Sequence, residues 1–313
     1  MHFPAGWLDR LRTLRSRFLD DDRAGVAMPD YWRDELDLTA YDALPAARIG
    51  WKWNAALREA RDRGLTIDPN ATVLDFGCGT GIAARRFLTR FPVREVLCHD
   101  RSARARAFAV ARLANEQPKV KARPLVQLDL TTFDVLLVSH VLGELDDDGR
   151  DALLALAQRA SVVVWVEPGS KAVSRHLGDM RSALLGAMHV VAPCPHAAIC
   201  PALASASDWC HFFAEPPPEV FTDGDWVKAA RELGIDLRSL PYSFLVMTKA
   251  LATTPPPPHR LLGRAAIGRH EATLQACTAE GLHQLEVRKR DQAALWRQLK
   301  KDPGGHRTLP AAP

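Results

Sequence analysis

Short apolar segments alternate with amphipathic segments through the middle of the chain. Segments of four to seven mostly apolar residues predict β-strands over residues 73–76, 95–99, 125–128, 133–139 and 161–167. Helical periodicity predicts helices between several of these strands, over residues 82–91, 102–115 and 150–160. Strands without polar alternation are typical of a parallel sheet covered on both faces, so the pattern favours an α/β fold.

The two ends of the chain differ from this central region. Residues 1–66 look helical, and a run of prolines at 255–258 precedes two β-like stretches at 265–277 and 283–290. We therefore expect four parts: a helical region over 1–66, an α/β domain over 67–252 with a Cys-rich insertion at 190–215, a small C-terminal β/helix unit over 259–303, and a disordered tail over 304–313.

Composition narrows the class of protein. Hydrophobic residues make up 47% of the chain and charged residues 25%, which is ordinary for a globular domain. No apolar run approaches the roughly 18 residues of a membrane-spanning helix, so we expect no membrane partner. Because no secretory signal is evident, we expect a cytoplasmic protein whose six cysteines are metal ligands or buried thiols rather than disulfides.

Basic residues gather near both ends of the chain, although the net charge is only +4. Such clusters suit contacts with phosphate groups, and they equally suit a solvated helix face. The clustered residues are Arg10, Arg12, Arg15 and Arg17 near the start, and Arg288, Lys289, Arg290, Arg297, Lys300 and Lys301 near the end.

A glycine-rich loop joins the first predicted strand to the helix that follows it. Gly77, Gly79 and Gly81 permit a tight turn, and the helix N-terminus offers free N–H groups. Asp75 precedes the loop, and Asp100 ends the second strand, where a carboxylate can accept bonds from both hydroxyls of a ribose. The Gly-x-Gly-x-Gly spacing differs from the dinucleotide pattern Gly-x-Gly-x-x-Gly, so an NAD-type enzyme and a ligand-free turn are less favoured alternatives.

This loop resembles motif I of the class I methyltransferases. The resemblance implies a Rossmann-like, mostly parallel seven-stranded sheet and S-adenosylmethionine as cofactor. Gly77 and Gly79 would line the amino-acid part of the cofactor, Asp100 would hold its ribose, and Asp129-Leu130 would lie beside the adenine. The implied cofactor-binding residues are Asp75, Gly77, Cys78, Gly79, Gly81, Asp100 and Asp129.

The end of the fourth predicted strand faces the place where a methyl acceptor would sit. Ser139 and His140 lie there, and His140 is a candidate catalytic base, although such a histidine can equally be packed or hydrogen-bonded. Neither an Asn/Asp-Pro-Pro-Tyr motif nor a Pro-Cys pair follows this strand. The sequence therefore lacks the motifs of N6-adenine and C5-pyrimidine methylation at this position.

Three cysteines crowd into the insertion that interrupts the strand–helix pattern. Cys194, Cys200 and Cys210 fall within 17 residues, with Pro or His beside them, and Cys277 offers a fourth thiolate. Thiolates are favoured next to a cation, so the cluster indicates a metal site. Four cysteines suit either tetrahedral Zn²⁺ or an iron–sulfur cluster, and the spacing matches neither zinc ribbons nor radical S-adenosylmethionine enzymes.

Several motifs occur together in an order that resembles one family. They are the glycine loop, His-Val-Leu-Gly-Glu-Leu at 140–145, Val-Glu-Pro-Gly-Ser at 166–170, the Cys-Pro-His and Asp-Trp-Cys-His-Phe segments, and Ser-Phe-Leu-Val at 243–246. The chain resembles, over roughly residues 45–290, the methyltransferase-like proteins associated with the small subunit of mitochondrial ribosomes, together with their bacterial relatives.

This resemblance implies a metal cofactor and a partner. The cofactor would be a [4Fe-4S] cluster on Cys194, Cys200, Cys210 and Cys277, and the partner would be small-subunit ribosomal RNA. Methyl transfer to that RNA is the leading hypothesis. A non-catalytic ribosome assembly factor that keeps the fold, and a zinc-containing small-molecule methyltransferase, stay open as alternatives.

Overall fold

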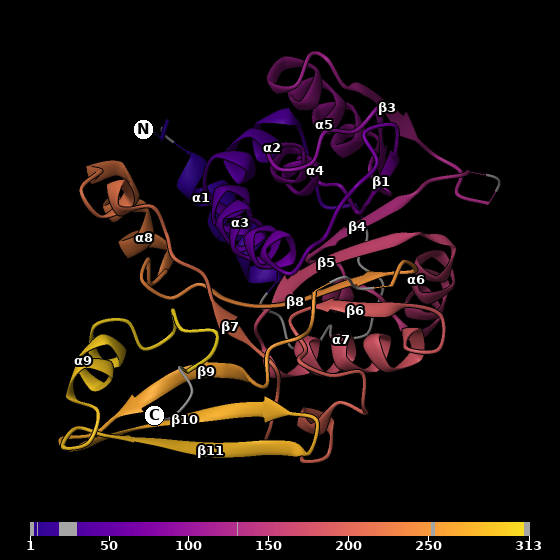
Figure 1. Cartoon of the computed structure of the whole chain (residues 1–313). Coiled ribbons are helices and arrows are strands. Elements are labelled where there is room, and N and C mark those ends of the chain that lie inside the picture. The colour runs from indigo at the N-terminus through magenta and orange to yellow at the C-terminus, as the bar shows by residue number, and fades with distance from the viewer. Residues whose placement is uncertain (1–2, 5, 19–29, 130, 252–253, 310–313) are drawn as a thin grey trace.

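The protein is built, in this computed structural model, around one twisted sheet (Figure 1). The structure describes residues 3–4, 6–18, 30–129, 131–251 and 254–309. In this part of the chain the sheet has eight strands, in the order β3-β2-β1-β4-β5-β8-β6, with β7 paired to β8. The strands are β1 (Thr72–Phe76), β2 (Glu95–His99), β3 (Lys121–Leu125), β4 (Val135–Ser139), β5 (Val162–Pro168), β6 (His189–Ala192), β7 (Phe212–Phe213) and β8 (Pro241–Thr248).

The direction of the strands identifies the fold. Strands β1 to β5 run parallel, and β8 is antiparallel to its paired strands β5, β6 and β7. This order, with one antiparallel strand next to the edge, is that of the Rossmann-like class I methyltransferases, so the predicted fold is confirmed. The chain passes from β1 to β2 and β3 on one side and returns to β4 and β5 on the other. Ligands bind at such a reversal, beyond the carboxyl ends of the strands.

Helices cover both faces of the sheet because neighbouring strand residues point to opposite sides. Val73 belongs to a core packed by α3 (Ala47–Asp62), α4 (Ile82–Leu88) and α5 (Ala103–Glu116). Leu74, the next residue, belongs to a second core packed by α6 (Asp147–Arg159) and α7 (Lys171–Leu184). Both faces of the central strands are therefore buried from solvent, as the unbroken apolar runs predict.

The N-terminal helices pack beside α3 rather than forming a separate body. Helix α1 (Trp7–Phe18) contacts α2 (Glu35–Tyr41) and α8 (Gly224–Leu233). Trp226 on α8 packs edge-on against Phe3, which precedes α1, at 6.0 Å and against Trp51 of α3 at 5.2 Å. Residues 19–29 of the expected helical region lie outside the described residues.

The C-terminal unit forms a second, smaller sheet. It consists of β9 (Arg260–Ile267), β10 (Glu271–Thr278) and β11 (Gly281–Arg288), with α9 (Ala293–Lys301) packed against it. The single β-like stretch expected over 265–277 is in fact parts of two strands. Gly268 N donates to Glu271 O at 2.8 Å and closes a tight turn between them, in a segment without the Asn-Gly or Asp-Gly signal of a hairpin.

The residues after α9 fold back along the small sheet. Backbone hydrogen bonds join Leu261 N to Arg307 O at 2.9 Å and Ala265 N to Pro303 O at 2.8 Å. The sequence suggested a disordered tail over 304–313. The structure places the first part of it, to residue 309, along β9, and residues 310–313 lie outside the described residues.

One strand lies earlier in the chain than its apolar residues indicated. The strand expected over 125–128 is found at Lys121–Leu125, at the edge of the sheet. Lys121, Arg123 and Pro124 are exposed to different degrees there, as is common on an edge strand, so hydrophobic patterning did not mark it. Among the described residues, no helix combines the length and the apolar character needed to cross a membrane.

Candidate functional site

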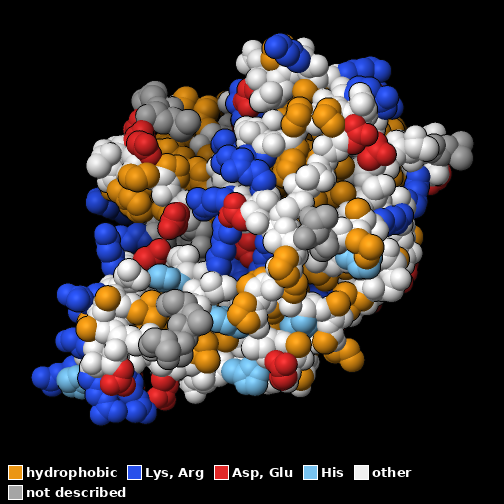
Figure 2. Space-filling model, viewed as in Figure 1, with side chains coloured by type: hydrophobic (Ala, Val, Ile, Leu, Met, Phe, Trp, Pro, Cys, Tyr) orange, Lys and Arg blue, Asp and Glu red, His pale blue; other side chains and the backbone are white. Residues whose placement is uncertain are grey.

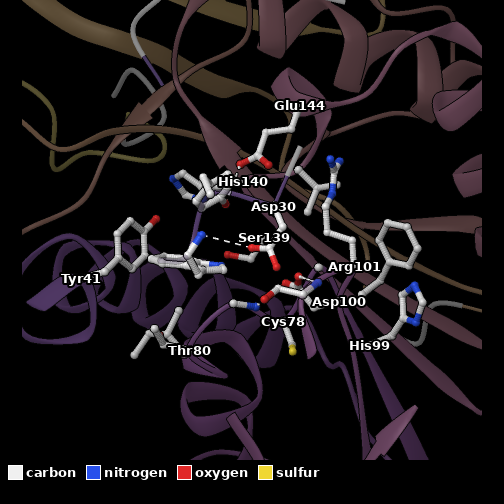
Figure 3. Close-up of a pocket in the computed structure, with 18 of the residues that line it drawn as sticks. Asp30, Tyr41, Cys78, Thr80, His99, Asp100, Arg101, Ser139, His140 and Glu144 are labelled. Atoms are coloured by element: carbon white, nitrogen blue, oxygen red, sulfur yellow. Dashed lines mark hydrogen bonds between the residues drawn. The ribbon is translucent and has the colours of Figure 1, made fainter. Parts of the chain in front are cut away.

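A cleft opens beyond the carboxyl ends of β1, β2 and β4, at the reversal of the strand order. It encloses about 1010 Å³, counting the open space at its mouth. In Figure 3 the labelled side chains surround one central space, with Tyr41 and His99 on opposite sides of it. The glycine loop, the end of β2, the end of β4 and the segment before α2 line it. Its main lining residues are Tyr31, Trp32, Tyr41, Gly77, Cys78, Gly79, Thr80, His99, Asp100, Ser139, His140 and Glu144.

The glycine loop has the backbone conformation that its composition predicts. Gly77 and Gly79 have φ angles of 66° and 51°, which residues with a side chain rarely adopt. A Cβ on Gly77 would lie 2.6 Å from Cγ2 of Val141, so the loop also passes close to the segment after β4. Cys78 N donates to His99 O at 2.9 Å and ties the loop to the end of β2.

Asp100 lies beside this loop and is bonded to it. Its Oδ2 accepts from Gly79 N, and its Oδ1 accepts from Ser102 N, each at 2.9 Å. Burial raises the pKa of Asp100 above its ordinary value, although both backbone N–H groups oppose the shift. The predicted pairing of the first and second strand ends is therefore present, with a carboxylate at the floor of the cleft.

Two other predicted residues support the loop from outside the lining. Asp75 is fully buried; its Oδ2 accepts from Ala84 N at 3.3 Å, and burial raises its pKa to about 8. Gly81 begins α4 with a φ of 75°, and a Cβ there would lie 3.1 Å from the Cβ of Ala109. Asp129 is exposed and does not line the cleft, and Leu130 lies outside the described residues.

The side of the cleft formed by the segment after β4 carries buried polar groups. Trp53 Nε1 donates to Ser139 Oγ at 2.9 Å, which fixes the serine at the end of the strand. Tyr31 OH donates to Glu144 Oε1 at 3.4 Å, and burial raises the pKa of Glu144 to about 7. His140 is neutral in this setting because burial lowers its pKa well below the usual value. Neutral imidazole and weakly acidic carboxyl groups are suited to receive and release protons near pH 7.

The four candidate metal-ligating cysteines meet in a second hollow, between the cysteine loop and the C-terminal sheet. Cys194, Cys200, Cys210 and Cys277 all line this space, which measures about 310 Å³ with the open space at its mouth included, and all are free thiols. Cys277 comes from β10, so the structure brings a residue distant in sequence to the other three. Among the described residues, no three His, Cys, Asp or Glu side chains are arranged to hold a single metal ion.

Arginines surround this second hollow. Arg181 Nε donates to Cys194 Sγ at 3.1 Å, and its other nitrogens donate to His196 O and Ala198 O. Arg63 donates to Cys194 O at 2.9 Å. Burial raises the pKa of Cys194, and that of Cys277 to about 12, so the bare thiols stay protonated. Ionising them requires a cation, and a guanidinium group on one of the four thiols suits a metal group whose complex is anionic.

Comparison with known proteins decides the family. The sequence matches the model of the family described as mitochondrial small ribosomal subunit Rsm22 over residues 40–307. The chain belongs to the Rsm22 family. The match includes the glycine loop, all four cysteines of the hollow and the C-terminal sheet, while Tyr31 and Trp32 of the cleft precede it. No curated protein sequence matches this chain.

Solved structures resemble the chain at low identity. A proposed RNA methyltransferase from Pyrococcus horikoshii is 13% identical, with 78% of this chain and 100% of that one covered and a TM-score of 0.39. Magnesium protoporphyrin IX methyltransferase from Synechocystis PCC 6803, solved with bound SAH, is 11% identical, with 79% and 95% covered and a TM-score of 0.42. Because both scores are below 0.5, the fold of this Rsm22 member is assigned from its strand order.

The sequence did not single out several residues of the two sites. Tyr31, Trp32 and Tyr41 form an aromatic wall of the cleft, but they precede the first strand and belong to no motif. The high density of aromatic residues in this short segment was the only feature of the sequence that could have indicated them. Arg63, directly after α3, and Arg181 of α7 hold the cysteine loop. No local spacing in the Rsm22 chain links either of them to a cysteine.

Proposed function

We propose that this Rsm22 member is an S-adenosylmethionine-binding, methyltransferase-like protein that acts on the RNA of the small ribosomal subunit. The observation that carries the proposal is the carboxylate of Asp100, held 2.9 Å from Gly79 N at the floor of a cleft at the strand reversal. A carboxylate in that place suits the two ribose hydroxyls of a nucleoside cofactor. The family, described as one of the mitochondrial small ribosomal subunit, supports the partner.

The residues of the cleft fit the cofactor part by part. The backbone of Gly77, Cys78 and Gly79 would hold the amino-acid portion, and Asp100 would hold the ribose. Asp75 and Gly81, which do not line the cleft, would fix the conformation of the loop. Asp129 would need to move from its exposed position to contact the adenine. The bound cofactor would supply an activated methyl group. The protein would contribute chiefly orientation of the acceptor and exclusion of water.

We further propose that Cys194, Cys200, Cys210 and Cys277 hold a [4Fe-4S] cluster. Support comes from four thiols on one hollow, two of them on buried and two on partly buried residues, with Arg181 donating to one of them. The cluster would order the loop and fix β10 against it, a structural role. A zinc ion on the same thiols is the alternative metal.

The surface of the C-terminal unit supports an RNA partner. Figure 2 shows Lys and Arg side chains gathered at the end of the small sheet, in the lower left of the view. Exposed basic residues there attract phosphates in a salt-dependent way. We define the C-terminal basic surface as Arg269, Arg288, Lys289, Arg290, Arg297, Lys300 and Lys301, all of which are exposed.

Two measurements test the cofactor and the partner. Calorimetric titration with S-adenosylhomocysteine is expected to give one site per chain, and the methyl group of labelled S-adenosylmethionine is expected to enter small-subunit RNA. Binding of cofactor and RNA without methyl incorporation would instead support the non-catalytic assembly factor. Failure to bind S-adenosylhomocysteine would reject the cofactor proposal.

The metal proposal has its own test. Protein purified without oxygen is expected to be brown, with about four irons and four sulfides per chain. The Cys200→Ser variant is expected to lose them, while Cys98→Ser, which changes a buried cysteine of β2, is expected to keep them. A colourless protein with one zinc would reject the cluster. Together with absent salt-sensitive RNA binding, it would favour the zinc-containing small-molecule methyltransferase.

A further inference from the structure

His140 has a strained backbone at the acceptor side of the cleft. Its φ of 57° is the only positive φ of a non-glycine residue in the described part of the chain. Its N–H donates to Val166 O at 3.0 Å, which holds the residue at the junction of β4 and β5. Strain of this kind persists where the surrounding structure enforces it, and it is concentrated at functional positions. The strain sets where the imidazole lies in the lining of the cleft.

The two ring nitrogens of His140 have different surroundings. Nε2 lies 3.2 Å from Nζ of Lys52 on α3, and which atom donates depends on the tautomer. Nδ1 is buried and has no hydrogen-bond partner among the described residues. Burying a ring nitrogen without a hydrogen-bond partner costs free energy. We therefore expect Nδ1 to form a hydrogen bond with a bound molecule rather than with the protein.

Lys52 is an unusual neighbour for a histidine. Burial lowers the pKa of Lys52 to about 7, and Arg48 adds to this shift, while Glu167 opposes it. Glu167 is itself buried, and its Oε1 accepts from Trp165 Nε1 at 2.8 Å as well as from the backbone N–H groups of Val141 and Leu142. In the described residues Lys52 forms no ion pair, so its amine is able to be uncharged near pH 7.

We propose that His140 and Lys52 form a proton relay, in which Nδ1 of His140 accepts the proton of an N–H or O–H methyl acceptor and passes the Nε2 proton to Lys52. This inference rests on the proposed function and deepens it. His140 is the catalytic residue, and Lys52 is a positioning residue that acts through it. The relay selects acceptors whose reacting atom carries an N–H or O–H proton, such as an amine, amide or hydroxyl, over a ring nitrogen without hydrogen.

The transfer balances as follows in atoms and charges. The acceptor atom forms a bond to the methyl carbon, and the carbon–sulfur bond breaks with its electron pair left on the sulfur, which becomes a neutral thioether. The acceptor proton goes to Nδ1, the Nε2 proton goes to Lys52 Nζ, and the resulting ammonium group returns its proton to solvent. No oxidant, reductant or further reactant is required.

The state of the relay depends on pH through Lys52. When Lys52 is an ammonium group it donates to Nε2, which leaves the single imidazole proton on Nδ1 and blocks that atom as a base. When Lys52 is uncharged it can accept from Nε2–H, and Nδ1 is then bare. His140 does not become charged in this range, because burial and Lys52 keep its pKa well below the ordinary value. The imidazole proton is therefore expected to change nitrogen near the pKa of Lys52.

Nitrogen NMR of the full chain with ring-labelled histidine tests this relay without any methyl acceptor. The His140→Gln variant assigns the signals by removing them. We expect Nδ1 to be unprotonated at about pH 8.5 and protonated at about pH 6, with Nε2 showing the reverse. In Lys52→Met the tautomer is expected to be independent of pH, and in Lys52→Arg the proton is expected to stay on Nδ1 throughout. Protonated Nδ1 at every pH in the unmodified protein, or the same titration in Lys52→Met, would overturn the relay.

Calorimetry separates failure of the relay from failure of the proposed function. Lys52→Met is expected to bind S-adenosylhomocysteine within about threefold of the unmodified protein, since Lys52 does not line the cleft. Where RNA methylation is measurable, His140→Gln is expected to slow it roughly 100-fold or more, and Lys52→Met to remove its rise with pH near 7. If the unmodified protein does not bind S-adenosylhomocysteine, the proposed function is rejected. If it binds and the tautomer of His140 does not change with pH, only the relay is rejected.

Discussion

Glu59 on α3 and Arg260 on β9 form a two-point ion pair, with N–O distances of 3.1 and 3.0 Å. Glu59 is 1% exposed, and Arg63 and Arg307 also bond to its carboxylate, at 3.1 and 3.4 Å. The two residues are 201 positions apart in the sequence. A single buried carboxylate thus joins the large sheet's helical layer, the small sheet and the segment after α9.

Replacing Glu59 with Gln is expected to destabilise the protein by about 3–5 kcal/mol, because three arginines would lose their common counter-charge. Urea unfolding measures the change. The control is Asp62→Asn on the same helix, since Asp62 is half-exposed and bonds only to Arg307 among the described residues. That variant is expected to change stability by less than about 1 kcal/mol. Equal effects of the two variants would show that burial of the Glu59 network is energetically unimportant.

Two glycines of the same loop are expected to differ in their tolerance of alanine. Both have positive φ, which costs about 1–2 kcal/mol for an alanine. At Gly79 nothing lies within 4 Å of the added methyl, whereas at Gly77 it would lie 2.6 Å from the stiff, β-branched side chain of Val141. Gly77→Ala is expected to cost about 1–3 kcal/mol more than Gly79→Ala in urea unfolding. Similar costs would mean that the loop shifts away from Val141 freely.

The fold was predictable from sequence because its signal is local. Unbroken apolar runs such as Val135–Ser139 mark central parallel strands, and glycines with a carboxylate before them mark the first turn. The strand at Lys121–Leu125 was misplaced because an edge strand need not be apolar. The two-strand split of the 265–277 stretch was missed because its turn residues, Arg269 and His270 among them, are not typical turn formers.

The candidate sites were predictable only in part, for a related reason. Asp100 and Gly77 lie at ends of adjacent parallel strands, so their meeting follows from sheet topology. Contacts such as Lys52 with His140, or Arg181 with Cys194, join elements whose separation in the chain carries no pattern. They result from helix packing, which depends on the shape of the whole core.

The carboxylate of Asp100 is expected to be required for cofactor binding. Asp100→Asn keeps the shape of the side chain but removes the charge, and should weaken S-adenosylhomocysteine binding by about 10- to 100-fold, since a hydrogen bond to a charged group is worth about 1.5–3 kcal/mol. Calorimetry provides the dissociation constants. Asp129→Asn, at the exposed position outside the cleft, is the matched control and should bind within about twofold. A strong effect of the control would place Asp129 at the adenine.

Glu167 is expected to make stability fall as pH rises. Burial raises the pKa of Glu167 from the ordinary 4.5 to about 7 in the folded protein, so the folded state holds this proton more tightly than the unfolded state. The stabilisation is complete below about pH 4.5 and is lost as pH rises through about 7. Relative to Glu167→Gln, the unmodified protein should lose roughly 2–4 kcal/mol between about pH 5 and pH 8.

Urea unfolding of both proteins at a series of pH values gives this difference directly. Titrating groups that do not interact with Glu167 cancel in the comparison, whereas Lys52, whose pKa Glu167 raises, contributes to it. Glutamine keeps an oxygen for Trp165 Nε1, so the hydrogen bond that anchors the side chain is retained. A difference between the two proteins that is constant with pH would indicate that Glu167 titrates in the folded state as it does in water.

The second hollow cannot be completed until translation has passed both Cys277 and the strand that pairs with β10. Three of its thiols leave the translating ribosome within one short stretch, but Cys277 follows Cys210 by 67 positions, and the β10 strand that holds it pairs with β11, later still. A chain that ends before β10 would contain three of the cysteines of the hollow but lack the strand that provides the fourth. The hollow therefore distinguishes a chain translated beyond β11 from one that stops before β10, in a protein whose family is named for a part of the ribosome.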